Sequence, residues 1–167
     1  LHLRHDGDPL RNEEIRGERL TPEEIVAIEQ ADEQRAHALQ AGCDKLIIPE
    51  YEHTYCDHLF HCGAGRESFA VSYDGIFRLC SDLWHPDCTF DLRNGTLAEA
   101  WNELTPRVRD LRSHDPEFLQ RCRVCPIINL CLWCPAHAWL EAGRMDAWCE
   151  WFCAVAHARA RAIQANA

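Results

Sequence analysis

The chain has 167 residues, of which 47% are hydrophobic and 26% are charged, and its formal net charge is −10. This is ordinary for one domain with a modest core. The acidic charge, without a basic stripe, predicts no nucleic-acid surface, and no apolar run approaches the roughly 18–20 residues of a membrane span. The chain contains eleven cysteines and opens with no export signal. We therefore expect a reducing, cytoplasmic setting, where clustered cysteines bind metal more often than they form disulfides.

The beginning of the chain is polar and suggests an incomplete protein. Residue 1 is Leu, and the single methionine is Met145, so we expect the chain to be the C-terminal part of something longer. In LHLRHDGDPLRNEEIRGERL, residues 1–5 suggest the tail of a strand, and residues 6–9, DGDP, predict a turn.

A helix is predicted from Thr21 to about Gln40. Thr21 is the N-cap, Pro22 occupies the first helical position, and Glu24 completes a capping box. Gly42 follows the end of this helix. Residues 46–48 predict a short strand before a proline.

An antiparallel hairpin is predicted between Cys62 and Cys80. Alternating residues in 69–73 form one strand, Asp74-Gly75 signals a type I′ turn, and residues 76–80 return. In that register Cys80 lies opposite Phe69. Residues 89–93 are a candidate third strand.

Three further helices follow the hairpin. One starts at Thr96 with Glu99 completing a capping box, and Pro106 should kink or split it. A short helix is expected over 135–142, closed by Gly143, and a last one over 146–164.

The densest motif is CRVCPIINLCLWC, residues 122–134, with the spacing C-x2-C-x5-C-x2-C. Thiolates are soft ligands that suit zinc or iron–sulfur clusters. Counting the cysteines from 56 to 134 without Cys88, and adding one downstream, gives eight thiols, enough for two four-cysteine sites. Two C-x2-C pairs would also suit a zinc site. The alternative is therefore a zinc-stabilised structural or interaction module, which leaves Cys56, Cys62 and Cys80 unexplained.

The order of the cysteines resembles the SPASM domain of radical S-adenosylmethionine enzymes. It reads C-x5-C, C-x12-G-x4-C, C-x2-C-x5-C-x2-C and a distal Cys, over about residues 50–160. The stretches FAVSYDGIFRLC, GTLAEAWNEL and CLWCPAHAWLEAG are also similar to that family. We expect an α+β fold: a small antiparallel hairpin sheet with flanking helices and two cluster-binding Cys-rich loops. Residues 1–48 would be the end of a barrel and a helical linker, and residues 49–167 the SPASM-like domain.

The resemblance implies two auxiliary [4Fe–4S] clusters whose ligands are interleaved in sequence. The first would be held by Cys56, Cys62, Cys80 and Cys134. The second would be held by Cys122, Cys125, Cys131 and Cys153. In the family, three residues separate the last two cysteines of the dense motif, whereas two residues separate Cys131 from Cys134 here. This departure concerns the assignment of Cys134 as a cluster ligand. Cys153 is preferred to Cys149 as the distal ligand because EWFCAVAHARA resembles the family's closing motif.

The catalytic motif of radical S-adenosylmethionine enzymes, C-x3-C-x2-C, does not occur in the sequence. LHLRHDGDPL…RLTPEEI is similar to the last strand and linker of their barrel. The chain therefore resembles the accessory half of such an enzyme, serving electron transfer and substrate positioning. We assign no catalytic residue and expect S-adenosylmethionine only in a longer form or a partner that carries the barrel. The implied partners are that barrel, an electron donor and a peptide or protein substrate.

The remaining cysteines and the aromatic residues receive structural interpretations. We expect Cys43, Cys88 and Cys149 to be free thiols. The histidines near the first site, His53, His58, His61 and His85, are interpreted as polar loop residues. The tryptophans in and after the dense motif are interpreted as core packing and cluster shielding: Trp133, Trp139, Trp148 and Trp151.

Overall fold

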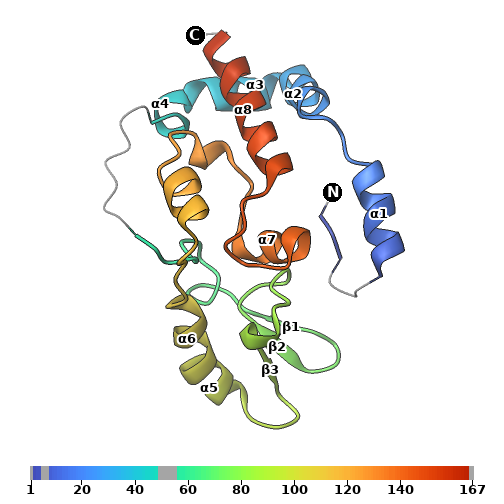
Figure 1. The fold of residues 1–167 in the computed structure, drawn as a ribbon, viewed down its shortest axis with the longest axis vertical. Helices are drawn as coiled ribbons and strands as arrows, with labels where there is room; N and C mark the ends of the chain where they lie inside the picture. Colours follow the sequence, from blue (N-terminus) through green and yellow to red (C-terminus); the bar gives the residue numbers. More distant parts are fainter. Residues whose placement is uncertain (1, 5–7, 49–55, 166–167) are drawn as a thin grey trace.

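A computed structural model describes residues 2–4, 8–48 and 56–165 of the chain. It has an α+β fold, as predicted, with helices around a small antiparallel sheet (Figure 1). The α-helices are α1 (Pro9–Gly17), α2 (Pro22–Ala31), α3 (Glu33–Ala41), α4 (Cys43–Leu46), α5 (Leu97–Glu99), α6 (Thr105–Arg109), α7 (Pro135–Ala142) and α8 (Glu150–Ala165). The strands are β1 (Ala70–Val71), β2 (Ile76–Arg78) and β3 (Thr89–Asp91). The short helical turns are η1 (Pro86–Cys88), η2 (Ala100–Leu104), η3 (Phe118–Cys122) and η4 (Ile128–Leu130).

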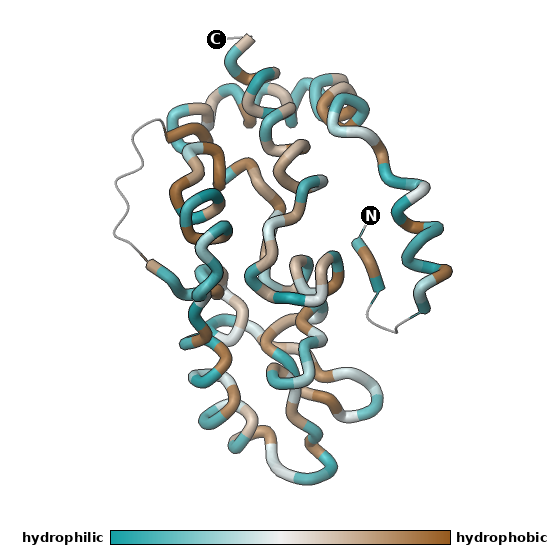
Figure 2. The backbone as a smooth tube through the Cα atoms, viewed as in Figure 1, coloured by the Kyte–Doolittle hydropathy of each residue, from teal (hydrophilic) through white to brown (hydrophobic). Residues whose placement is uncertain are grey.

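The first twenty residues contain a helix that the sequence prediction missed. Asp8 caps α1, because its side chain accepts hydrogen bonds from the backbone N–H of Leu10 and Arg11 at 3.1 and 3.2 Å. Figure 2 shows mainly hydrophilic residues over α1, which buries none of its residues. Residues 2–4 form no strand in the described chain, and the backbone of Arg4 instead bonds the side chain of Asn12 in α1 at 2.8 and 3.0 Å. Residues 6 and 7 of the predicted turn over 6–9 lie outside the described residues, and residues 8 and 9 form the start of α1.

The helix predicted from Thr21 to Gln40 is interrupted at Asp32. The capping box of Thr21 and Glu24 is confirmed, and Gly42 ends α3 as predicted. Asp32 has an extended backbone, with φ −88° and ψ 104°, and its side chain accepts from the N–H of Arg35 at 2.9 Å. Aspartate favours such a cap over a helix interior because its side chain competes for backbone hydrogen bonds. The strand predicted over 46–48 is wrong, since Leu46 belongs to α4 and residues 47–48 form no strand.

The sheet has the order β1-β2-β3 and is antiparallel throughout. The hairpin and the third strand are confirmed, but the register is one residue away from the prediction. Ala70 pairs with Arg78, so the loop contains three residues rather than two. Gly75 ends this loop with φ +83°. A type I turn followed by a left-handed glycine is a common three-residue hairpin loop, and its extra residue shifts the pairing.

The main core lies between the sheet and the helices that follow it. Phe77, Leu79 and Phe118 are fully buried in a cluster that extends from Leu59 to Ala136. The capping box of Thr96 and Glu99 is confirmed. The predicted helix is split: a π-helical turn, η2, leads into α6, which has a proline in its first turn. The closure of α7 by Gly143 is confirmed, whereas α8 begins at Glu150, four residues later than predicted.

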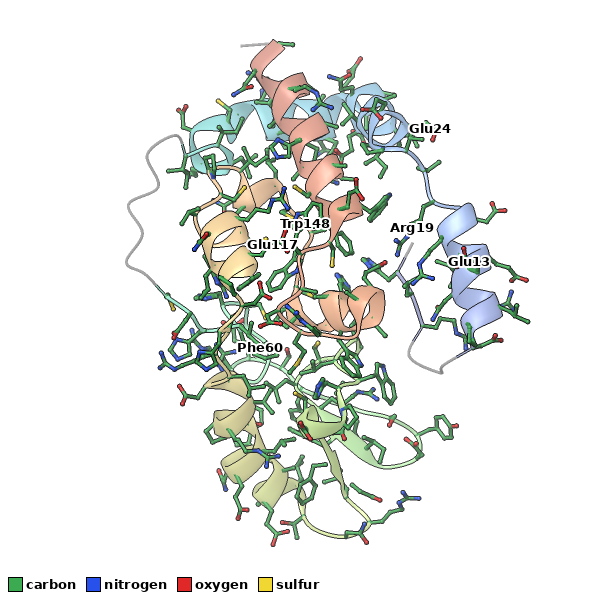
Figure 3. The ribbon with its side chains drawn as sticks, viewed as in Figure 1. Glu13, Arg19, Glu24, Phe60, Glu117 and Trp148 are labelled. Atoms are coloured by element: carbon green, nitrogen blue, oxygen red, sulfur yellow. The ribbon has the colours of Figure 1, made fainter. Side chains whose placement is uncertain are left out.

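Two buried ion pairs join the N-terminal helices to the C-terminal part. Arg159 of α8 bonds Glu29 of α2 at 2.8 and 2.9 Å. Arg19, labelled in Figure 3, follows α1, pairs with Glu141 of α7 and lies 4.7 Å from the centre of the Trp151 ring. None of the described helices has both the length and the apolarity needed to cross a membrane.

Two glycines with the same backbone conformation should respond very differently to alanine. Gly65 and Gly143 both have φ +71°, a region that costs an L-residue about 1–2 kcal/mol. A Cβ at Gly65 would lie 2.8 Å from Leu79 Cγ and 3.0 Å from Thr105 Cγ2, whereas one at Gly143 would meet nothing within 4 Å. We expect Gly65→Ala to lower the free energy of unfolding by about 1–3 kcal/mol more than Gly143→Ala, because overpacking is added to backbone strain. Urea unfolding of both variants checks this, and equal losses would contradict it.

Candidate metal centre

A cavity of about 160 Å³ lies among the cysteines of the dense motif and the start of α8. Its wall includes five thiols: Cys122, Cys125, Cys131, Cys149 and Cys153. The local structure explains how they meet. Cys122 ends the π-helical turn η3, Cys131 directly follows the 3₁₀ turn η4, and Cys153 lies in the first turn of α8. Four of the five are the predicted ligands of the second cluster, and the fifth is the alternative distal cysteine.

The electrostatics of this group link the same four cysteines. Burial, the largest cause, and the nearby Cys131, Cys153 and Cys125 together raise the pKa of the Cys122 thiol to about 12. Burial also raises the pKa values of Cys125 and Cys131, and Cys153 adds to both. Several thiolates this close repel one another, so the group ionises only if a cation offsets their charge. We call Cys122, Cys125, Cys131 and Cys153 the second thiol group.

Cys149 lines the same cavity but has a different set of neighbours. It is 7% exposed, and its thiol donates a weak hydrogen bond to the carbonyl oxygen of Ala147 at 3.7 Å. Burial, the largest cause, together with Glu141, Cys122, Cys131 and Cys134 raises its pKa to about 12. The pKa of Cys149 is therefore raised by cysteines predicted for both clusters. Cys153, in contrast, raises the pKa values of three cysteines that are all predicted for the second cluster.

Cys62, Cys80 and Cys134 form a first thiol group at the junction of the sheet and α7. Burial raises the pKa of Cys80, with additions from Asp82 and Cys62. Burial, with smaller contributions from Cys80 and Asp82, raises the pKa of Cys134 to about 11. Cys134 is the N-cap of α7, and its sulfur accepts from the N–H of His137 at 3.4 Å. The electrostatic neighbours of Cys134 therefore include Cys80, whereas the cysteine neighbours of Cys131, three residues earlier, belong to the second thiol group.

Cys56, predicted for the first cluster, lies among histidines. Its sulfur is 3.3 Å from Nδ1 of His58 and 3.9 Å from Nε2 of His61. His58 in turn contacts Oδ1 of Asp110 through Nε2 at 3.0 Å. The contacts described for Cys56 are therefore with imidazoles, and the three other predicted ligands are linked to one another.

The tryptophans of this region pack around the thiols. Trp133 and Trp148 line the cavity of the second thiol group, and Figure 3 shows Trp148 near the middle of the molecule, between α7 and α8. Nε1 of Trp133 donates to the carbonyl oxygen of Ala147 at 2.8 Å. Trp139 instead packs against His85, with ring centres 4.4 Å apart.

Two arginines near the first thiol group were missed by the sequence analysis. Arg109 of α6 donates to the carbonyl oxygens of Phe60 and Cys62 at 3.3 and 3.0 Å, and so holds the Cys62 loop. No sequence signal reveals this contact across about fifty residues. Arg78 of β2 is only 4% exposed. The sequence could have indicated that Arg78 lies near this site, because in the predicted strand over 76–80 Arg78 and Cys80 are two residues apart. Side chains two apart in a strand share a face.

The donor set fits a cluster that fills a space between thiols. All eleven cysteines are free thiols. Within the described ranges, no three His, Cys, Asp or Glu side chains are close enough to hold one metal ion. A structural zinc ion needs four ligands at about 2.0–2.3 Å around one point. Iron–sulfur clusters are also held by four cysteines, but inorganic sulfide widens the core that the thiolates surround. The cavity of about 160 Å³ among the second thiol group is a space of this kind, with cysteines in its wall rather than around one point.

Comparisons with known proteins agree with this chemistry. Residues 62–126 match the SPASM family, an iron–sulfur cluster-binding domain. An uncharacterized protein of Archaeoglobus fulgidus is 32% identical over 111 residues, which is 64% of this chain and 26% of that protein. The chain thus spans about a quarter of the length of this relative. No solved structure matches.

Proposed function

We propose that this chain, whose residues 62–126 carry a SPASM iron–sulfur cluster-binding domain, holds two [4Fe–4S] clusters and serves as the auxiliary part of a radical S-adenosylmethionine enzyme. Cys56, Cys62, Cys80 and Cys134 would hold the first cluster, and the second thiol group would hold the second. The single observation that carries the proposal is the cavity lined by five thiols. For Cys56, the proposal requires its sulfur to leave the histidines when the first cluster forms.

When bound, such clusters supply one-electron chemistry, which suits electron transfer to or from a substrate. The protein's own groups prepare the sites. Cluster binding must displace the protons that burial keeps on the thiols, so assembly releases protons. Arg109 holds the loop of Cys62, and the N–H of His137 orients the sulfur of Cys134. Trp133 and Trp148 contribute apolar walls to the second site.

The residues that would hold the two clusters come close together in the chain. Cys131 and Cys134 lie three residues apart in one loop yet interact with different thiol groups. Cys149 interacts with both groups. A barrel in the longer protein would carry the S-adenosylmethionine chemistry, and the auxiliary clusters would pass electrons and help to position a peptide or protein substrate beside it.

The test is the iron, sulfide and zinc content of the chain after anaerobic reconstitution. We expect about eight iron and eight sulfide per chain, because two four-cysteine sites each hold a [4Fe–4S] cluster. Treatment with an iron chelator under reducing conditions should remove both the iron and the brown absorbance. Stoichiometric zinc without sulfide would instead support the zinc-stabilised module and refute the redox function.

A further inference from the structure

Arg78 is a buried cation with unsatisfied hydrogen-bond donors. Its side chain leaves β2 and is 4% exposed, and its Nε and Nη1 are buried without any hydrogen-bond partner. Arginine stays protonated in proteins, so a buried guanidinium needs an anion or acceptors. The Trp84 ring centre lies 3.3 Å from its Cζ, and this cation–π contact offsets part of the burial cost. The contact with the ring face leaves the N–H groups of Nε and Nη1, which lie in the plane of the guanidinium, without an acceptor.

Arg78 is the last residue of β2, and Cys80 of the first thiol group follows two residues later. The ionisable groups whose negative form would favour its guanidinium are Asp74, Cys80 and Asp82. Asp74 is exposed in the hairpin loop, where it bonds Ser72. The side chain of Asp82 is 55% exposed and lies 3.7 Å from Nε2 of His137. Water screens both carboxylates, whereas Cys80 is partly buried and lies beside Cys62 and Cys134.

We propose that Arg78 is the buried counter-charge of the first cluster and donates N–H hydrogen bonds to its sulfur atoms. The inference rests on the proposed function, because it needs a cluster at the first thiol group. Four thiolates outweigh the positive core, so the site is net negative and becomes more so when it takes up one electron from a reductant. Arg78 keeps its proton throughout. A fixed positive charge stabilises the reduced state more than the oxidised one, and hydrogen bonds to sulfur act in the same direction. Arg78 therefore raises the reduction potential of the first cluster.

The test is an anaerobic redox titration of the reconstituted whole chain, followed by electron paramagnetic resonance. Arg78→Met removes the positive charge but retains a long apolar side chain that can pack on the Trp84 ring. Arg78→Lys retains the positive charge. Arg66→Met is the matched control, because Arg66 is an exposed arginine four residues after Cys62. The Cys125→Ala chain identifies the signal of the first cluster, and the second cluster serves as an internal reference.

We expect Arg78→Met to lower the equilibrium constant for reduction of the first cluster about tenfold, which is about 59 mV for one electron. Arg78→Lys should recover most of this shift, and Arg66→Met should change nothing. An unchanged potential in Arg78→Met overturns the inference. If Arg78→Met loses the first cluster while Arg78→Lys keeps it, the counter-charge role is supported; if both lose it, the role is structural and the inference fails. Absence of iron and sulfide in the native chain would refute the proposed function itself, a separate result.

Discussion

Replacing Cys153 by Ala should halve the iron of the reconstituted chain, from about eight to about four per chain, because one four-cysteine site loses a ligand. Cys149→Ala should leave the iron content unchanged. Both thiols line the same cavity, and the two residues are one helical turn apart. Cys153 is distinguished by its interactions with Cys122, Cys125 and Cys131. Iron and sulfide assays on the purified variants measure the effect.

The interleaved assignment adds a sharper control to this experiment. If Cys131 and Cys134 serve different clusters, the double variant Cys131→Ala/Cys134→Ala should lose nearly all iron. The double variant Cys131→Ala/Cys153→Ala, with the same number of thiols removed, should retain about four iron. Cys43→Ser controls for the loss of a thiol outside both groups. Equal iron in the two double variants would contradict the interleaving, and loss of iron in Cys149→Ala but not in Cys153→Ala would exchange their roles.

Arg159→Met should lower the free energy of unfolding by about 3–5 kcal/mol, since it leaves the largely buried carboxylate of Glu29 with only a 3.4 Å contact to the exposed Arg35. The side chains of Arg159 and Glu29 are only 8% and 15% exposed. Arg159 also donates to the carbonyl oxygen of Leu130 at 3.0 Å, next to Cys131. The variant should therefore loosen the packing of α2 on α8, as measured by anaerobic urea unfolding of the cluster-loaded chain.

The same pair of helices provides a matched control. Arg161 of α8 contacts Glu23 of α2 at 3.4 Å, but their side chains are 66% and 72% exposed. Arg161→Met should cost no more than about 1 kcal/mol, because water screens an exposed pair. Adding Glu29→Met to Arg159→Met should restore most of the lost stability, since apolar groups then replace both charges. Similar losses for Arg159→Met and Arg161→Met would show that burial does not set the strength of this pair.

Local sequence signals predicted the helix ends well where a single side chain satisfies the backbone. The capping boxes at Thr21 and Thr96 and the glycine closure at Gly143 depend on residues within one turn, so no tertiary information was needed. The hairpin signal at Asp74-Gly75 was equally local. Its register was wrong by one residue because the same dipeptide suits loops of two and of three residues.

The sequence alone predicted iron–sulfur binding for this protein, in agreement with the family match, and the tertiary structure decided how its residues are grouped. Cysteine spacing was enough to predict thiolate sites and the SPASM resemblance, because ligand type and order are properties of the chain. Spacing did not reveal which neighbours Cys134, Cys149 and Cys56 have, since each belongs to a segment oriented by distant contacts. The burial of Arg78 and its packing on Trp84 likewise emerged only in three dimensions, because burial depends on packing between elements far apart in sequence.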